Sequence, residues 1–246
     1  MKVIFNGELT EGIELLPGDW LPGNGIFETL RGEGRDYFGL HRHYCRAKES
    51  ARFELPDEVE VTRALQELLQ AENYPVSRIR ISFRDDGTWL ITNNLYQDLE
   101  PARLMIFPER AKNKNPVLKS FPYQQNLSLQ KSAQANGFDD GILITNDGEV
   151  CETSIANIAL EIDQQWVTPP LTAGILNGVM RAVAIESNEI QVAPIDLTQL
   201  EKATRGILLT SLRIAQEISE IGGRKLMGSE SKVAQIWKLI EGLRNF

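Results

Sequence analysis

The chain has 246 residues, of which 42% are hydrophobic and 24% charged, so it can form one large or two modest domains and is too apolar for disorder. Its formal net charge of −8 argues against nucleic acid as a partner, yet allows a small anion in a local basic pocket. Cys45 and Cys151 are too few for a disulfide framework, and Glu8 and Glu11 interrupt the N-terminal apolar run before a signal peptide forms. No stretch provides the roughly 20 apolar residues of a membrane helix. We therefore expect a soluble, cytoplasmic protein without a membrane partner.

The N-terminal part of the chain mixes strand and helix patterns. Alternating apolar residues bounded by glycine or Asp-Gly turns predict strands and hairpins, and apolar residues at helical spacing predict helices. In chain order these are a strand and turn at 2–9, a hairpin at 25–40, helices at 41–55 and 57–74, and a strand–turn–strand at 76–92. This part is therefore predicted to be an α+β domain with helices beside an antiparallel sheet.

The C-terminal part repeats this mixture after a polar, proline-ended segment at 109–116, which is the best candidate for a linker. The predicted elements are a helix near 126–136, strands within 140–153, 157–163 and 164–169, a helix beginning near Leu176, a strand at 205–211 and an amphipathic helix at 231–246. The sequence thus predicts a small N-terminal α+β domain at 1–112, a larger C-terminal domain at 113–246, and a cleft between them.

Several kinds of catalytic site are excluded because the only histidines, His41 and His43, lie close together in "HRHYC". No histidine elsewhere can serve a distant serine or cysteine nucleophile. His41, His43 and Cys45 would share a face on a strand and suggest a metal site, but this stretch has the pattern of a helix start. No further cysteine or histidine completes a zinc site, so we expect no metal.

Lys119, in "VLKSFPY", has apolar neighbours that suit a lysine nucleophile, whose amine must be neutral part of the time. A surface lysine is the ordinary alternative. A lysine that carries pyridoxal phosphate needs a carboxylate for the pyridinium nitrogen and N–H groups for the phosphate. Glu152 ends a predicted strand and is the candidate carboxylate, whereas Glu149 lies near the turn. Gly178 and Val179 start a predicted helix and are the candidate anion site, although the stretch also suits an ordinary loop.

Seven segments resemble, in order, those of class IV aminotransferase-type (fold-type IV) pyridoxal-phosphate enzymes. They are "GNGIFETLR", "LHRHYCRA", "LKSFPY", "GFDDGILITNDGEVCET", "SIANI", "PPLTAGILNGVMR" and "LLTSLR". The resemblance implies a two-domain α+β fold with pyridoxal 5'-phosphate in the cleft between the domains. Lys119 falls on the lysine that forms the Schiff base, and Arg46 on an arginine that binds the phosphate.

The resemblance implies further cofactor contacts. Tyr123 matches the tyrosine at the phenolic oxygen, Glu152 the pyridinium glutamate and Asn157 the asparagine after it. The helix start at Gly178, Val179 and Met180 and the late loop with Thr210 or Ser211 match the phosphate-binding segments. This sequence departs from the family at Asn24, usually aspartate, and at Ala159, often aromatic, and its late loop is one residue short.

The resemblance leaves the reaction open. The compact chain, "TSLR" and Met180 in place of a usual threonine favour 4-amino-4-deoxychorismate lyase, which releases 4-aminobenzoate and pyruvate for folate biosynthesis. A class IV aminotransferase acting on branched-chain or D-amino acids is the alternative, and a non-catalytic protein that binds the cofactor is a second. Arg84 is a weak candidate for the substrate carboxylate, in competition with Arg31, Arg78 and Arg80. The resemblance also implies a homodimer and a small-molecule amino substrate.

Overall fold

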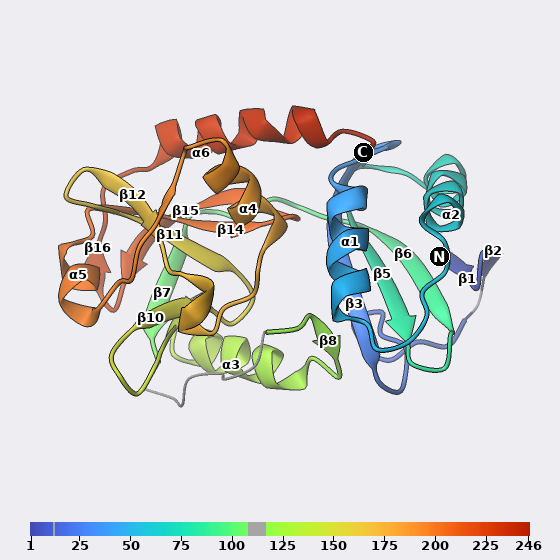
Figure 1. The fold of residues 1–246 in the computed structure, drawn as a ribbon, viewed down its shortest axis with the longest axis horizontal. Helices are drawn as coiled ribbons and strands as arrows, with labels where there is room; N and C mark the ends of the chain where they lie inside the picture. The colour runs from blue at the N-terminus through green and yellow to red at the C-terminus, as the bar shows by residue number, and fades with distance from the viewer. Residues whose placement is uncertain (12, 108–116) are drawn as a thin grey trace. The chain divides into compact units, whose positions relative to one another are not determined.

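The computed structural model describes residues 1–11, 13–107 and 117–246, so the predicted linker at 109–116 lies outside the described residues. The chain forms two compact units, each with its own sheet. The first unit comprises Met1–Asp98, Leu118–Pro122 and Ile240–Phe246, and the second comprises Leu99–Val117 and Tyr123–Leu239. The predicted α+β class is confirmed, with separate sheets and helices in each unit (Figure 1).

The first unit contains a seven-stranded sheet in the order β2-β1-β6-β5-β3-β4, with β8 also paired to β3. Its strands are β1 (Lys2–Phe5), β2 (Glu8–Glu11), β3 (Gly25–Gly34), β4 (Asp36–Tyr37), β5 (Tyr74–Arg84), β6 (Trp89–Leu95) and β8 (Ser120–Phe121). The long strands β3 and β5 are antiparallel from Gly25↔Arg84 to Gly34↔Tyr74. This pairing places β3 in the interior of the sheet.

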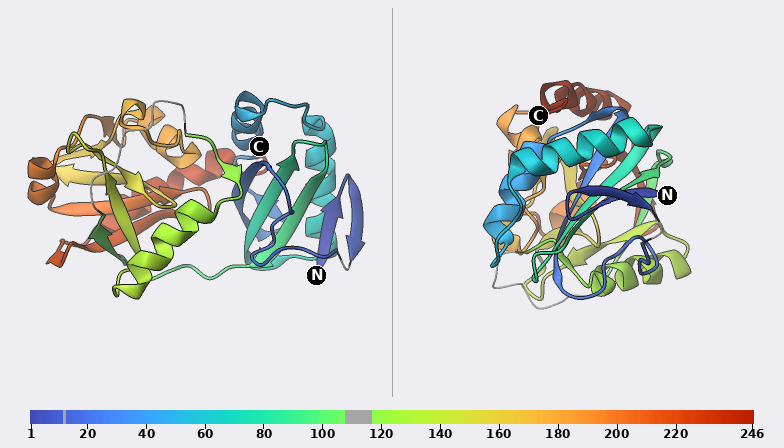
Figure 2. Two further views of the ribbon diagram at one scale, coloured as in Figure 1. Left: turned by 90° about the horizontal axis from the view of Figure 1, so that it is seen from below. Right: turned by 90° about the vertical axis from the view of Figure 1, so that its right-hand side faces the viewer.

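Two helices cover this sheet, α1 (Leu40–Ser50) and α2 (Glu58–Ala71). Helix α1 packs against β3, and α2 packs against β1, β2 and β6 (Figure 2). The Asp57 side chain accepts a hydrogen bond from the backbone N–H of Val59 and caps α2. Leu65 and Leu68 of α2 are fully buried in the apolar core between helix and sheet. Both helices were predicted, but α1 ends at Ser50 because Ala51 adopts an extended conformation.

The second unit contains a nine-stranded sheet in the order β10-β9-β7-β15-β14-β11-β12-β13, with β16 paired to β15. Its strands are β7 (Ala102–Ile106), β9 (Asp140–Ile144), β10 (Val150–Thr153), β11 (Asn157–Ile162), β12 (Gln165–Thr168), β13 (Gln191–Val192), β14 (Arg205–Thr210), β15 (Ile214–Ile221) and β16 (Arg224–Lys225). Its helices are α3 (Gln124–Ala135), α4 (Val179–Glu186), α5 (Leu197–Lys202), α6 (Glu230–Lys238), and the 3-10 segments η1 (Leu171–Ala173) and η2 (Leu239–Leu243), the latter continuing into the first unit. Helix α3 packs on β9, α4 on β14, α5 on β11 and α6 on β15. The apolar core lies between these helices and the strands.

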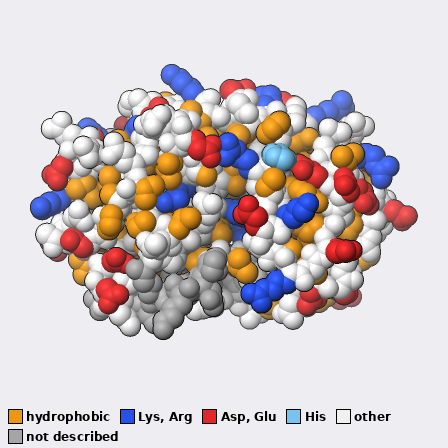
Figure 3. All heavy atoms as spheres, viewed as in Figure 1, with side chains coloured by type: hydrophobic (Ala, Val, Ile, Leu, Met, Phe, Trp, Pro, Cys, Tyr) orange, Lys and Arg blue, Asp and Glu red, His pale blue; other side chains and the backbone are white. Residues whose placement is uncertain are grey.

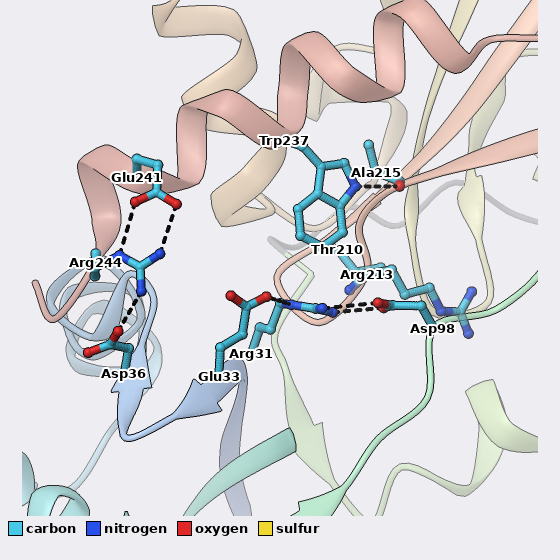
Figure 4. A network of polar contacts seen from close by, with 10 residues as sticks. All are labelled: Arg31, Glu33, Asp36, Asp98, Thr210, Arg213, Ala215, Trp237, Glu241 and Arg244. Atoms are coloured by element: carbon cyan, nitrogen blue, oxygen red, sulfur yellow. Dashed lines mark hydrogen bonds and ion pairs between the residues drawn. The ribbon is translucent and has the colours of Figure 1, made fainter. Parts of the chain in front are cut away.

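The chain crosses between the units at places other than the predicted boundary at 112. Strand β7 precedes that boundary but belongs to the second unit, because it pairs with β9 and β15 of that unit. Residues 118–122 follow the boundary but return to the first unit, because β8 pairs with β3. The C-terminal residues also belong there: the Arg244 guanidinium binds Asp36 (Figure 4). In addition, the Gly39 N–H donates to the Leu243 carbonyl at 2.9 Å.

Charged side chains of both signs are interspersed with apolar ones on the face of the molecule shown in Figure 3. The net charge of −8 is therefore not gathered into one acidic patch on that face. Within the described ranges of the chain, no helix is both long enough and apolar enough to span a bilayer.

Candidate active site

Lys119 lies in the first unit, where β8 holds it beside β3. The backbone N–H of Phe27 donates to the Lys119 carbonyl at 2.8 Å, and the Lys119 Nζ lies 4.6 Å from the centroid of the Phe27 ring. The Trp20 ring packs edge-on against Phe27, with 4.7 Å between centroids, and also contacts Phe121. Lys119 is half-buried. Its amine thus lies beside aromatic rings, surroundings that suit a lysine nucleophile.

Arg46 binds a buried carboxylate of the first unit that the sequence reasoning missed. The Arg46 Nε donates to Glu28 Oε1 at 2.9 Å, and the His43 Nδ1 lies 2.6 Å from Glu28 Oε2. Burial alone would raise the pKa of Glu28, but Arg46 and His43 outweigh it and lower that pKa to about 2. Burial lowers the pKa of His43, and the charges of Arg46 and Lys119 act in the same direction although Glu28 opposes them. We infer a neutral His43 beside an ionised Glu28.

The predicted helix start is confirmed for the histidine pair. His43 is directed to Glu28, whereas His41 contacts Glu58 at 2.8 Å and Cys45 at 3.6 Å. The two histidines therefore do not converge on one point. In the described parts of the chain, no group of three or more histidine, cysteine, aspartate or glutamate side chains is arranged to hold a metal ion.

The candidate substrate arginines have different surroundings. Arg84 is engaged in the β5–β6 turn by Asp86 and by Thr88, whose Oγ1 lies 3.1 Å away, and its substrate role stays a prediction. Arg80 lies over the Trp20 ring, 3.9 Å from its centroid, and donates to the Gly18 carbonyl at 2.5 Å. Trp20 in turn packs on Phe27, so aromatic rings connect Arg80 with the Lys119 amine.

The other two arginines have carboxylate partners. Arg31 is buried and paired with Glu33 and Asp98, each at 2.7 Å, as Figure 4 shows. Burial tends to lower the pKa of Arg31, but its hydrogen bonds to these carboxylates raise it overall. Arg78 pairs with Asp19 at 2.8 Å. Both guanidinium groups therefore stabilise the first unit through ion pairs.

Glu152 and Asn157 come together in the second unit on either side of the turn between β10 and β11. The Asn157 Nδ2 donates to Glu152 Oε2 at 2.8 Å and to the Leu176 carbonyl at 3.0 Å, and the Leu176 N–H lies 3.2 Å from Glu152 Oε1. Glu152 is only 8% exposed. A buried, hydrogen-bonded carboxylate of this kind is suited to hold a protonated ring nitrogen. Glu149, the alternative, lies at the end of the turn that leads into β10, where its carbonyl accepts a hydrogen bond from the Thr145 N–H at 2.9 Å.

The predicted anion site lies at the start of α4, which begins at Val179 rather than near Leu176. Asn157 binds the Leu176 carbonyl, and Gly178 is the extended N-cap residue. A Cβ at Gly178 would lie 1.9 Å from Asn157 Oδ1, so glycine allows the close approach of this loop to Asn157. The N–H groups of the first helical turn have no acceptor within the helix, which makes this terminus suitable for a phosphate. The Met180 side chain is buried and offers no hydrogen-bond donor.

Arg181 supports this helix start from the interior of the second unit. Its Nε donates to Thr168 Oγ1 at 3.3 Å and its NH2 group to the Pro169 carbonyl at 2.7 Å. Burial lowers the pKa of Arg181, and the negative charge of Glu152 opposes that shift. Arg181 therefore ties α4 to the loop before it and adds a positive charge near Glu152.

Tyr123 precedes α3, and its hydroxyl donates to the Ser154 carbonyl at 3.4 Å. Asn126 in the first turn of α3 donates to the same carbonyl at 2.6 Å. Thr210 ends β14, and its Oγ1 accepts a hydrogen bond from the Arg213 N–H at 2.9 Å, so it closes the turn that contains Ser211. Figure 4 shows this turn. The choice between Thr210 and Ser211 as a phosphate contact stays a prediction.

The family model named Amino-transferase class IV matches residues 25–221. The chain belongs to the class IV aminotransferase family. A Schizosaccharomyces pombe protein named "Putative aminodeoxychorismate lyase" is 27% identical over 201 residues, covering 76% of this chain and 86% of its own length. A Rickettsia conorii protein named "Probable branched-chain-amino-acid aminotransferase" is 27% identical over 240 residues, covering 85% of this chain and 82% of its own.

Solved structures of class IV aminotransferases share this fold. "A hypothetical aminotransferase from Mycobacterium tuberculosis, PLP-bound form" superposes with a TM-score of 0.85 at 19% identity, covering 98% of this chain and 99% of that one. The predicted fold-type IV class is thereby confirmed. Class IV aminotransferases depend on pyridoxal 5'-phosphate, so this protein is an enzyme of that cofactor class.

The described residues fit that cofactor within each unit. The first unit carries Lys119 beside the Phe27 ring and the cation Arg46 bound to Glu28. The second carries a buried carboxylate, Glu152, next to the start of α4. The sequence reasoning missed Glu28, which binds Arg46, and Asn126 and Asp140, which bind Ser154. The only signal for Glu28 was its place inside the "FETLR" motif, where a charged residue interrupts an apolar strand.

Proposed function

We propose that this enzyme is a 4-amino-4-deoxychorismate lyase that releases 4-aminobenzoate and pyruvate in the cytoplasm for folate biosynthesis. The observation that carries the proposal is the similarity to the S. pombe protein with a lyase name, which extends over 86% of that protein. Met180 supports it: a methionine at the start of α4 leaves the backbone as the phosphate partner there, as the lyase form of this motif does.

The proposed reaction needs a base that removes a proton and a group that stabilises the resulting negative charge. Pyridoxal phosphate, when bound, supplies an electron sink for the carbanion formed on the substrate. Lys119 removes the proton from the ring carbon that carries the amine. The bond between the adjacent ring carbon and the ether oxygen then breaks, the oxygen keeps the electron pair, and the released enolpyruvate takes up a proton on its methylene carbon to give pyruvate. Loss of that group makes the ring aromatic. The atoms of the two products add up to those of the substrate, so no oxidant or second substrate is needed.

The other residues hold the reacting groups. Glu152 would accept a hydrogen bond from the protonated ring nitrogen of the cofactor, while Asn157 and the Leu176 N–H keep its carboxylate in place. Arg46 would supply positive charge for the phosphate, and the start of α4 would supply N–H donors for it. Because Arg46 is already bound to Glu28, its guanidinium is held in a fixed orientation before the phosphate binds.

Arg80 is the arginine that we propose for a substrate carboxylate, in place of Arg84. Its guanidinium lies on Trp20, which packs on the Phe27 ring beside Lys119, whereas Arg84 is engaged in its own turn. Arg80→Lys should raise KM for the substrate at least about tenfold, because lysine cannot stack and bind bidentately. Arg84→Ala is the control and should leave KM within about twofold. Equal effects of both substitutions would contradict the choice of Arg80.

The proposal is tested by giving the purified holoenzyme 4-amino-4-deoxychorismate and measuring both products. Equal amounts of 4-aminobenzoate and pyruvate would support the lyase, and Lys119→Ala should reduce the rate by at least about a thousandfold, while Lys131→Ala on the exposed face of α3 should not. Parent-like turnover by Lys119→Ala would overturn the role of Lys119.

A class IV aminotransferase acting on branched-chain or D-amino acids is the second candidate. The similarity to the R. conorii protein, over 85% of this chain, favours it. Amino-group transfer from leucine, isoleucine, valine or D-alanine to 2-oxoglutarate, without release of 4-aminobenzoate in the first assay, would select this function over the lyase.

We propose a homodimer as the active form and a small amino compound as its substrate. Light scattering of the purified holoenzyme at micromolar concentration measures its molecular mass and so tests whether it is a dimer. A mass twice that of the 27.7 kDa chain is expected, and a single-chain mass with full activity would contradict the dimer.

A further inference from the structure

Asp140 is a buried carboxylate that accepts hydrogen bonds from the adjacent Gly141 N–H and from Ser154 in the turn after β10. It is the first residue of β9 and is 1% exposed. Its Oδ1 accepts hydrogen bonds from Ser154 Oγ at 2.5 Å, from the Ser154 N–H at 3.3 Å and from the Gly141 N–H at 2.8 Å. Its buried Oδ2 has no hydrogen-bond partner among the residues that the structure describes. Burying a carboxylate costs folding free energy, so we expect Asp140 to serve a function at this position.

Ser154 connects Asp140 to the N-terminal end of α3. Its carbonyl accepts hydrogen bonds from Asn126 Nδ2 at 2.6 Å and from the Tyr123 hydroxyl at 3.4 Å. Hydroxyl hydrogen bonds are usually about 2.7–2.8 Å long, so the carbonyl orients Tyr123 while engaging its proton only weakly. The Asn126 amide is the short, dominant partner of that carbonyl. Ser154 therefore links Asp140 both to the first turn of α3 and to the Tyr123 hydroxyl.

The rest of this turn is held without Asp140. The Thr153 N–H donates to the Ala156 carbonyl at 2.8 Å, and the Ala156 N–H donates to Thr153 Oγ1 at 3.0 Å. These bonds do not involve Asp140, so we expect them to keep β10 and β11 joined when Asp140 is changed. The specific consequence of losing Asp140 is therefore a displaced Ser154.

We propose that Asp140 is a positioning residue that acts through Ser154 to fix the Tyr123 hydroxyl at the phenolic oxygen of the cofactor. The inference rests on the proposed function only in the contact of Tyr123 with that oxygen. No step of catalysis is assigned to Asp140 itself. Its role is to hold Tyr123 in the orientation in which it can donate to the cofactor.

The test measures the dissociation constant of pyridoxal phosphate for the apoenzyme by absorbance titration. Asp140→Leu removes both acceptors and should weaken binding about tenfold, whereas Asp140→Asn retains one carbonyl oxygen for Ser154 and should stay within about twofold. Ser154→Ala keeps the backbone carbonyl and should weaken binding by a smaller factor of about three. Asp139→Leu is the matched control, because this exposed neighbour binds the Arg103 N–H and has no contact with Ser154.

A double-mutant cycle decides whether Asp140 acts through Tyr123. In the Tyr123→Phe background, Asp140→Leu should add less than a twofold loss. A full additional tenfold loss, or normal affinity in Asp140→Leu, would overturn the inference. If Tyr123→Phe itself leaves the affinity and the visible absorption band unchanged, the Tyr123 contact fails, and with it the inference, whereas product release by the parent still decides the lyase. Thermal unfolding of each apoenzyme checks folding, and if Asp140→Leu is unfolded, the Ser154→Ala cycle with Tyr123→Phe replaces it.

Discussion

Replacing Glu28 by glutamine tests the buried network of the first unit. Ionised Glu28 is 3% exposed, with Arg46 Nε at 2.9 Å and His43 Nδ1 at 2.6 Å. The pKa of Glu28 falls from the ordinary 4.5 to about 2. Since a tenfold change in proton affinity is worth about 1.4 kcal/mol, the difference corresponds to about 3 kcal/mol of folding stability. Removing one partner of a buried ion pair costs a similar amount.

The lowered pKa of Glu28 also determines how the folding stability depends on pH. Because the folded pKa of Glu28 lies below the unfolded value, its contribution is fully present above pH 4.5 and is lost as the pH falls from 4.5 towards 2. His43 acts in the same direction: its folded pKa is below the ordinary 6.5, so the unfolded chain takes up this proton first as the pH falls. Glu28→Gln should therefore be about 3 kcal/mol less stable at pH 7 and lose less stability than the parent below pH 4.5.

Urea unfolding followed by circular dichroism at several pH values measures both effects, and hydrogen exchange of the β3 peptide confirms that the loss lies in the first unit. Glu58→Gln is the control: Glu58 pairs with the largely exposed His41 at 2.8 Å, and its loss should cost less than about 1 kcal/mol. Equal stability of Glu28→Gln and the parent at pH 7, or identical acid destabilisation of the two, would refute the reasoning.

Two substitutions, one in each unit, test packing. Gly178→Ala places a methyl group 1.9 Å from Asn157 Oδ1, so we expect an about tenfold loss of pyridoxal-phosphate affinity in absorbance titrations, whereas Gly242→Ala, which meets no atom within 4 Å, should change nothing. Leu65→Ala empties a fully buried position on α2 and should lower the free energy of urea unfolding by about 2–5 kcal/mol, whereas Val59→Ala, at a residue that is 77% exposed, should cost less than about 0.5 kcal/mol. A parent-like Gly178→Ala or Leu65→Ala enzyme would contradict these packing arguments.

Local sequence pattern determined most of the individual elements. The Asp57 cap and the apolar spacing around Leu65 predict α2, and the Asp86-Gly87 pair predicts the turn between β5 and β6. These signals are readable because capping, turn formation and helix periodicity depend on residues a few positions apart. The sequence also identifies Lys119 and Glu152 as candidates. The cofactor chemistry needs a lysine and a carboxylate, and the family motifs indicate which lysine and which glutamate these are.

The tertiary structure decided which distant segments belong together and which polar groups are buried. Strand β7 joined the second unit and β8 the first because sheet hydrogen bonds formed across long separations along the chain. The same folding brought Glu28 to Arg46, and Asp140 to Ser154. No local pattern identifies the partners of these carboxylates. Their burial, their partners and the low pKa of Glu28 arise only when the surrounding elements exclude water.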